Sequence, residues 1–594
     1  MKLVGTAAVC GVCLASFAHA APLDTLAFHR DRERSGWNAS EATLTPAAIS
    51  RQGLRLHWES PQFDAVDGYP PRLYASPLYV DEVQTASAAH RGQFGVVFAA
   101  TSNGFAYAVN TRANGSTAAG AILWRTQLGP PCKLEPNLLD GILTGVLATP
   151  VIDRQRRRLY VTSCEPTKRW QAFALDLADG SVLPGWPVAL NEEALRSPGL
   201  NRNAGAEGDA RERRFYYTLQ RGALNLSPDG AQLYVTFGDT ATGLLVAVDT
   251  RSAKVTSAFS SVATPHRRTG GIWGPGGATV DADGGVFVVT GSNFSGYVER
   301  PNDWTQSVLA FANGPKGLTL RGTYTPFNHC ATAAMDIDLG SGGIALLPPL
   351  NSASSTTSHM AVVGGKQGNI YLLDRRHLPG KLDRRPACST DSATDASLLA
   401  PEAQAHFGKR GPLNVFGPYS DTYGAMDLAR GRSVPALFRD AQGAIHLIVT
   451  GNTKKDAAST TNVAPSLARL KVMTMRGRPA WLRVEQTEKT LALENPGSPI
   501  VTSNGARDPV VWVLDPNARR STLLVGGGSP QPVLYAFDAV TLRLLWRSAP
   551  GQLHTSGKYN EPAVARGTVF VGTDRIQAFG LTGNSRTAGE RQSR

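Results

Sequence analysis

The chain repeats one pattern of apolar and polar positions along most of its 594 residues. In each repeat a β-branched run leads into a glycine-rich or polar turn, and a second apolar run follows that often ends in Asp, as in MAVVGGKQGNIYLLD from Met360. Short apolar runs bounded by turn residues predict buried strands, and almost no segment shows the period of a helix. The repeats start at Val96, Arg158, Gln232, Gly285, Met360, His446, Thr522 and Thr568.

Further strands are predicted around these eight units. Some precede a unit, as in ASPLYVD (75–81), ATPVID (148–153), GSPIVTS (497–503) and EPAVAR (561–566), and Trp-containing ones follow, as in AILWRT (121–126) and RLLWRS (543–548). Four short antiparallel strands per unit predict an all-β fold, an eight-bladed β-propeller of four-stranded antiparallel blades.

The last unit lacks a fourth strand of its own. The segment LRLHWESP (54–61), far upstream, carries the pattern of the Trp-containing outer strands. We therefore expect this N-terminal strand to pair with TVFVGTD or IQAFG of the last unit and close the ring, because an unpaired blade edge would expose backbone groups.

The sequence predicts three regions. Residues 1–20, MKLVGTAAVCGVCLASFAHA, have the layout of a secretory signal peptide, with a Lys near the start, an apolar stretch and the small-x-small ending Ala18-His19-Ala20. The apolar stretch is shorter than the roughly 20 residues of a spanning helix, so no transmembrane segment is expected. Residues 21–583 form a single propeller domain, and 584–594 form a disordered basic tail. The expected location is periplasmic or secreted.

Four cysteines remain after the signal peptide, namely Cys132, Cys164, Cys330 and Cys388. An even number in an oxidising compartment suggests two disulfides, and three pairings are possible. Pairing neighbours along the chain joins Cys132 to Cys164 and Cys330 to Cys388, and unpaired buried thiols are the alternative. No CxxCH haem motif and no Cys/His zinc spacing occurs.

The formal net charge of +13 comes largely from scattered Arg residues. They lack the aromatic interleaving of a nucleic-acid platform, so no nucleic-acid partner is expected and the basic residues are interpreted as a solvated surface.

The repeat endings LYAFDAVTLRLLW and IYLLDRR resemble the tryptophan-docking blades of the pyrroloquinoline quinone (PQQ) dehydrogenases and their PQQ-like relatives, which are eight-bladed propellers. The segment FHRDRERSGWNASEATLTPAAISRQGLRLHW (28–58) resembles their N-terminal signature, with Phe28 in place of the usual Trp. The vicinal cysteine pair that covers the quinone in many members is absent.

This resemblance assigns candidate roles to two residues in GGIWGPGGATVDADGGVFVVTGSNF (270–294). Trp273 corresponds to the tryptophan that stacks on the quinone, and flanking glycines allow close approach to a planar ligand. Asn293 corresponds to the asparagine that binds the metal ion, which is Ca²⁺ or a lanthanide in this family. The alternative for Trp273 is an ordinary core residue in the propeller centre.

Four more residues match less completely. In MDIDLG, Asp336 corresponds to the catalytic base and Asp338 to the additional carboxylate that binds the metal in lanthanide-using members. Lys366 in GGKQGNIYLLDR corresponds to the lysine that contacts the quinone, and Glu165 in YVTSCEP lies near the metal-binding glutamate, without the surrounding GAE-x-GVR pattern. The alternatives are aspartates capping a turn and an exposed turn lysine.

Two functions follow from the resemblance. The first is an exported oxidoreductase that uses PQQ and a bound metal ion to oxidise an alcohol, polyol or aldehyde and passes electrons to a separate acceptor protein. The second is a non-catalytic propeller that acts as a protein-binding scaffold in the cell envelope. Trp273 and the paired aspartates favour the enzyme.

Overall fold

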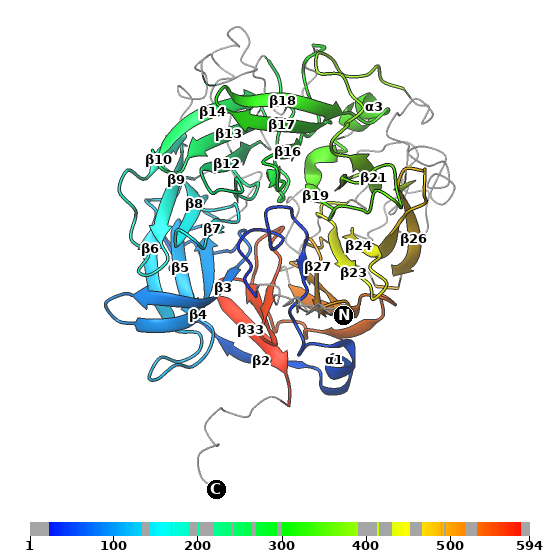
Figure 1. Cartoon of the computed structure of the whole chain (residues 1–594). Coiled ribbons are helices and arrows are strands. Elements are labelled where there is room, and N and C mark those ends of the chain that lie inside the picture. Colours follow the sequence, from blue (N-terminus) through cyan, green and yellow to red (C-terminus); the bar gives the residue numbers. More distant parts are fainter. Residues whose placement is uncertain are drawn as a thin grey trace, which may run out of the picture.

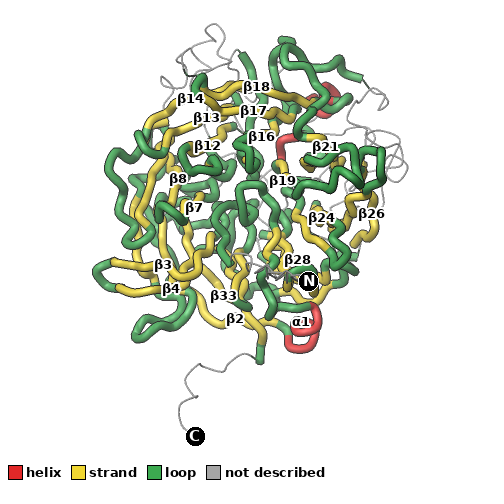
Figure 2. The backbone as a smooth tube through the Cα atoms, in the orientation of Figure 1, coloured by secondary structure: helices red, strands yellow, loops and turns green. Residues whose placement is uncertain are grey.

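Strands arranged as blades around a central axis dominate the computed structural model (Figure 1). Figure 2 shows that helix is confined to a few short segments. The predicted signal peptide (1–20) and basic tail (584–594) lie outside the described residues. The structure describes residues 23–133, 142–167, 169–190, 200, 219–238, 242–263, 269–293, 300–334, 336–389, 413–414, 431–451, 466–488, 490–491, 493, 495–516 and 532–583.

Eight sheets form the ring, and we number the blades 1 to 8 in chain order. The strands of blades 1 to 4 are β3 (Leu78–Ala86), β4 (Arg91–Thr101), β5 (Phe105–Asn110) and β6 (Ile122–Gln127); β7 (Val151–Asp153), β8 (Arg158–Cys164), β9 (Trp170–Asp176) and β10 (Val188–Leu190); β11 (Asn225–Leu226), β12 (Gln232–Phe237), β13 (Leu244–Asp249) and β14 (Lys254–Ser260); β15 (Thr279–Val280), β16 (Val286–Val289), β17 (Val308–Gly314) and β18 (Gly317–Tyr324).

The second half of the chain continues the same order. The strands of blades 5 to 8 are β19 (Ile344–Leu346), β20 (Met360–Gly364), β21 (Asn369–Asp374) and β22 (Leu413–Asn414); β23 (Ala436–Arg439), β24 (Ile445–Thr450), β25 (Leu467–Met473) and β26 (Trp481–Glu488); β27 (Ile500–Asn504), β28 (Arg507–Asp515), β29 (Val533–Asp538) and β30 (Leu544–Arg547); β31 (Ala563–Ala565), β32 (Thr568–Gly572), β33 (Ile576–Leu581) and β2 (Leu54–Glu59). In the part of the chain that the structure describes, two helices, α1 (Pro46–Gln52) and α3 (His329–Ala334), and a 3-10 turn, η2 (Leu339–Ser341), lie between strands.

Burial explains the two kinds of strand pattern in the sequence. Inner strands such as β20 are buried on both faces because each blade packs between two others, so their sequences read as unbroken apolar runs. Outer strands such as β2 alternate between buried and exposed positions. Among the described residues, eight buried apolar clusters each join two neighbouring blades, including blades 8 and 1.

The predicted closure of the ring is confirmed. Strand β2 pairs antiparallel with β33, with Leu54 opposite Leu581 and Glu59 opposite Gln577. The N-terminal strand therefore supplies the fourth strand of blade 8, which the last repeat lacks.

Blade 7 contains a strand, β28, that the sequence analysis did not name. The strand expected at Thr522 lies outside the described residues, and in the described part β29 pairs with β28 on one side and β30 on the other. The segment RDPVVWVLD forms β28 and supplies the strand beside β29. A short strand, β1 (Trp37–Asn38), adds to β27 in parallel as a fifth strand.

The N-terminal segment (residues 23–45), dark blue in Figure 1, lies across the middle of the ring and contacts every blade in order before it reaches α1. Its backbone pairs with inner strands of six blades, and side-chain amides join the other two, through Asn225 to Arg32 O in blade 3 and through Asn38 to Val564 O in blade 8. The backbone donor–acceptor pairs are Thr25–Tyr79, Ile152–Leu26, Val280–Arg32, Leu346–Glu33, Leu437–Ser35 and Val501–Gly36.

Arg34 anchors this segment at the centre of the ring. Its guanidinium is fully buried and donates hydrogen bonds of 2.8–3.3 Å to five backbone carbonyls, those of Phe28, Ala223, Leu224, Gly276 and Ala278. Burial lowers the pKa of Arg34 to about 10, although nearby carboxylates oppose the shift. The side chain therefore stays charged at neutral pH. It donates hydrogen bonds to buried backbone carbonyls that would lack these donors without it.

Both expected disulfides are present. Cys132 pairs with Cys164 and Cys330 pairs with Cys388, with Cα–Cα distances of 5.5 and 5.9 Å. The first bond lies in blade 2 and is buried, whereas Cys330 lies on α3 and is exposed. Within the described part of the chain, no helix has the length and apolar character needed to cross a bilayer.

Candidate functional site

The candidate residues come from two sets of turns in blades 4 and 5. Trp273 precedes β15 and Asp336 and Asp338 precede β19, the innermost strands of these blades, whereas Gly291 and Ser292 follow β16 and Lys366 follows β20. In a meandering blade the turn before the first strand and the turn after the second lie at the same end. The side chains therefore meet at one end of the ring.

The ammonium group of Lys366 is the centre of this cluster. Its Nζ donates to the backbone oxygen of Asp336 at 2.9 Å, to Asp336 Oδ1 at 3.0 Å and to Asp338 Oδ2. The other oxygen of Asp338, Oδ1, accepts from the backbone N and the Oγ of Ser292, both at 2.6 Å. The carboxylate pair, Asp336 and Asp338, is thus joined through one lysine.

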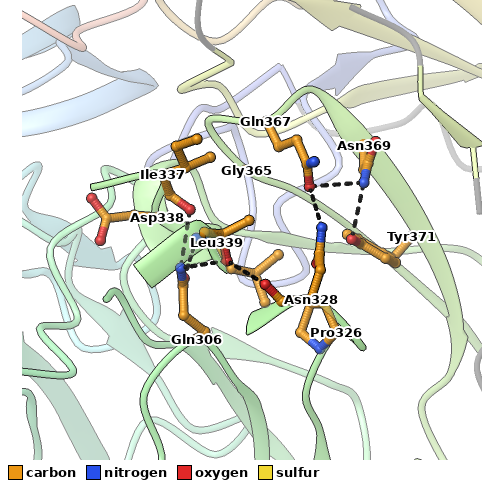
Figure 3. A pocket seen from close by; sticks show the side chains of 11 residues that line it. Gln306, Pro326, Asn328, Ile337, Asp338, Leu339, Gly365, Gln367, Asn369 and Tyr371 are labelled. Atoms are coloured by element: carbon orange, nitrogen blue, oxygen red, sulfur yellow. Dashed lines mark hydrogen bonds between the residues drawn. The ribbon is translucent and has the colours of Figure 1, made fainter. Parts of the chain in front are cut away.

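The backbone around Asp338 is held on both sides by one side chain. Gln306 Oε1 accepts from Leu339 N at 2.7 Å, and its Nε2 donates to Ile337 O at 3.0 Å (Figure 3). The backbone N of Lys366 donates to Asp338 O at 2.9 Å. A Cβ on Gly365 would lie 2.8 Å from that same oxygen, so glycine is required for this close approach.

Asp336 has an uncommon backbone conformation. Its φ of 54° lies in the left-handed region, which Asp tolerates better than most residues. About half of its side chain (49%) is exposed, in contrast to 6% for Asp338 and for Lys366. Asp336 is therefore the member of the carboxylate pair that solvent or a substrate reaches.

The two carboxyl groups have opposite pKa shifts. Burial raises the pKa of Asp336, and the negative charge of Asp338 adds to this effect while Lys366 opposes it. Burial also acts to raise the pKa of Asp338, but Lys366 and Ser292 outweigh it and bring that pKa to about 2. Asp338 therefore remains ionised, and Asp336 is the better proton acceptor of the two.

Trp273 lies beside this cluster and is 7% exposed. Lys366 Nζ and the guanidinium carbon of Arg221 each lie 5.2 Å from its ring centroid. Arg221 also lies 4.9 Å from the centroid of Tyr559, whose ring packs edge-on against Trp273 with the centroids 6.5 Å apart. A Cβ on Gly291 would come within 3.0 Å of Trp273 Nε1 and 2.9 Å of Asp338 Oδ1, so this glycine allows the two side chains to approach each other.

No protein-family model matches this sequence, and no curated protein matches it. Solved structures with the same architecture do exist. A quinohaemoprotein alcohol dehydrogenase from Comamonas testosteroni aligns over 97% of this chain and 83% of its own, with 14% identity and a TM-score of 0.54. The corresponding enzyme ADHIIG from Pseudomonas putida HK5 aligns over 96% and 82%, with 12% identity and a TM-score of 0.53. A europium-containing methanol dehydrogenase aligns over 94% and 98%, with 14% identity and a TM-score of 0.55.

This chain has the quinoprotein dehydrogenase fold. Identities of 12–14% establish shared architecture, and the function must be argued from the site.

The structure brings together four of the six candidate residues that the sequence analysis named. Trp273, Asp336 and Asp338 all lie next to Lys366. Asn293 follows Ser292 and forms a backbone bridge with Thr269.

Glu165 belongs to a separate network in blade 2. Its carboxylate accepts hydrogen bonds from Thr167 and Gln171, close to the disulfide of Cys164. Across the residues that the structure describes, no three His, Cys, Asp or Glu side chains are grouped to hold a metal ion.

Sequence reasoning missed several residues that shape the site, among them Arg221, Tyr559, Ser292 and Gln306. Arg221 stands in QRG, just before the first strand of blade 3, and Tyr559 stands before the first strand of blade 8. These are the positions that Trp273 occupies in blade 4. Comparing the residue at this place in every repeat would therefore have identified both.

Proposed function

We propose that the chain is an exported oxidoreductase that holds PQQ against Trp273 and oxidises an alcohol, polyol or aldehyde. A separate acceptor protein would receive the electrons. The observation that carries this proposal is that Lys366 contacts both members of the carboxylate pair and lies over the Trp273 ring.

The residues around Trp273 suit a flat, anionic ligand. An indole ring is a good stacking partner for a planar ligand, and Lys366 and Arg221 place two cations within 5.2 Å of the Trp273 centroid. PQQ is planar and carries carboxylates, so Trp273 and Arg221 are expected to contact it, and Lys366, which already donates to three protein oxygens, would contribute its positive charge. When bound, PQQ would supply the oxidant that accepts the hydride equivalent of the substrate.

Asp336 is assigned the role of general base. Its exposure admits a substrate hydroxyl, and its raised pKa makes it a better proton acceptor than an ordinary aspartate. Lys366 orients this carboxylate through Oδ1. Asp338 stays ionised and holds the lysine in place.

The metal ion that the resemblance implies fits this site less well. Both oxygens of Asp338 already accept hydrogen bonds, from Ser292 and Lys366, and Glu165 is engaged with Thr167 and Gln171. The set of Asn293, Asp338 and Glu165 is therefore not carried into the proposed chemistry.

Two observations favour export. Both cysteine pairs form disulfides, and such bonds persist in oxidising compartments. The leading sequence MKLVGTAAVCGVCLASFAHA has the layout of a signal peptide.

A dye-linked assay with PQQ and a panel of alcohols and aldehydes tests the proposal. Asp336→Asn should lower kcat by at least about 100-fold with little change in PQQ binding, because a general base acts on the chemical step. Asp508→Asn is a matched control, since Asp508 also has a φ of 54° but is exposed on β28. If no substrate is oxidised, or if both variants behave alike, the oxidoreductase proposal is wrong and the scaffold function is favoured.

A further inference from the structure

Lys366 has the surroundings of a bound cation. Its ammonium group meets three oxygens, Asp336 O at 2.9 Å, Asp336 Oδ1 at 3.0 Å and Asp338 Oδ2, and lies 5.2 Å from the Trp273 centroid. An ammonium group has three N–H donors, so each donor has an oxygen partner. The side chain is only 6% exposed, so this charge is fixed inside the protein.

These oxygens are the kind that a hard metal ion would need. Ca²⁺ takes about six to eight oxygen ligands, with carboxylates and backbone carbonyls as its preferred donors. Lys366 already uses one oxygen from each carboxylate and a carbonyl, and Ser292 uses the remaining oxygen of Asp338. A metal ion here would have to displace these donors and would lie beside a second positive charge.

The backbone keeps the lysine at this place. Lys366 N donates to Asp338 O at 2.9 Å, so the lysine and the carboxylate that it neutralises are tied through main chain as well as side chain. Gly365 has no room for a Cβ against that oxygen, and Gly431 N donates to Lys366 O at 3.4 Å. Displacing the ammonium group would therefore require the lysine side chain to rotate away from Asp338 while the lysine backbone stays hydrogen-bonded to the carbonyl of the same residue.

We propose that the Lys366 ammonium is a built-in cation that takes the place of a metal ion at the carboxylate pair, so that the native protein binds neither Ca²⁺ nor a lanthanide there. This inference goes beyond the proposed oxidoreductase function and does not depend on quinone binding. It concerns only what neutralises Asp336 and Asp338.

Terbium luminescence tests the inference directly. Tb³⁺ binds where Ca²⁺ or a lanthanide would, and tryptophan excitation sensitises its emission only over short distances, so Trp273 reports on this site. The wild-type protein should bind no Tb³⁺ at this site. When it is titrated with TbCl₃, any sensitised emission should therefore be the same in the wild-type protein and in Asp338→Asn. Lys366→Met should create a site that binds one Tb³⁺ at least about 100-fold more tightly, since removing the ammonium group leaves two uncompensated carboxylates.

Four kinds of control keep the result specific. The new emission should fall in Lys366→Met combined with Trp273→Phe or with Asp338→Asn, and CaCl₂ should compete with Tb³⁺. Lys381→Met removes an exposed lysine outside the carboxylate cluster and should behave as wild type. Lys366→Arg keeps the charge and should also remain without the site.

Two outcomes would overturn the inference. The first is a single Tb³⁺ or Ca²⁺ bound by the wild-type protein and lost in Asp338→Asn. The second is a folded Lys366→Met protein that gains no metal affinity. If Lys366→Met fails to fold, Lys366→Gln provides the same comparison, and the wild-type titration decides the first outcome by itself. Failure of PQQ uptake, measured separately, would refute the proposed function and leave this result unchanged.

Discussion

Replacing Arg34 with methionine would remove the charged group that ties the N-terminal segment to blades 3 and 4. Methionine keeps most of the apolar stem, so packing in the ring centre changes little. The substitution deletes five hydrogen bonds, and the carbonyl oxygens of Phe28, Ala223, Leu224, Gly276 and Ala278 each lose a donor.

The expected loss of stability follows from these five bonds. A hydrogen bond to a charged group contributes about 1.5 kcal/mol at the low end, and a buried carbonyl left without its partner costs about 1 kcal/mol or more. Ala278 O keeps its hydrogen bond from Asn225, and methionine avoids the desolvation of a guanidinium, which offsets part of the loss. We therefore expect Arg34→Met to lower the free energy of unfolding by about 3 kcal/mol or more.

Equilibrium urea unfolding followed by circular dichroism measures this effect. Arg32→Met is the control, because Arg32 lies in the same segment, is 39% exposed and pairs only weakly with the adjacent Glu33 at 3.2 Å. The control should change stability by less than about 0.5 kcal/mol. If Arg34→Met were as stable as Arg32→Met, the N-terminal segment would not be anchored by these carbonyl contacts and the reasoning would be refuted.

Two further predictions concern the disulfides and the seam where the ring closes. Replacing both Cys132 and Cys164 with serine should lower the free energy of unfolding by about 3–4 kcal/mol, because the disulfide closes a loop with a sequence separation of 32. Urea unfolding measures this loss, and an unchanged unfolding midpoint would contradict the prediction. At the seam, the hydrogen bond from Arg566 lowers the pKa of Asp81, so stabilisation by this carboxylate is present above about pH 4 and is lost as the pH falls through the lower folded-state value. Asp81→Asn should therefore cost about 1 kcal/mol at pH 7 and less near pH 3, and an equal cost at both pH values would argue against the ion pair.

Strand positions and ring closure were predictable from the sequence for a physical reason. Strands packed between two blades are buried on both faces, so they appear as unbroken apolar runs, and the missing fourth strand of blade 8 left a visible gap that LRLHWE fills. In blade 7 the same reasoning left out RDPVVWVLD, which forms β28 and pairs with β29.

The central anchoring by Arg34 could not be predicted, because its partners are backbone carbonyls that any residue would supply. The contact between Arg221, Trp273 and Tyr559 joins blades 3, 4 and 8 and exists only once the ring is closed. Motif matches identified Asp336, Asp338 and Lys366, but only the structure shows that one ammonium group contacts both carboxylates.

The most direct test of the proposed function is a titration of the purified protein with PQQ, with and without EDTA. Binding should reach one equivalent and quench tryptophan fluorescence, and most of that quenching should disappear in Trp273→Phe but persist in Trp546→Phe, a residue on the outer strand β30. EDTA should not prevent uptake if Lys366 supplies the positive charge of the site. No PQQ uptake, with or without added Ca²⁺ or lanthanide, or quenching unaffected by Trp273→Phe, would contradict the claim that this ring of blades holds a quinone.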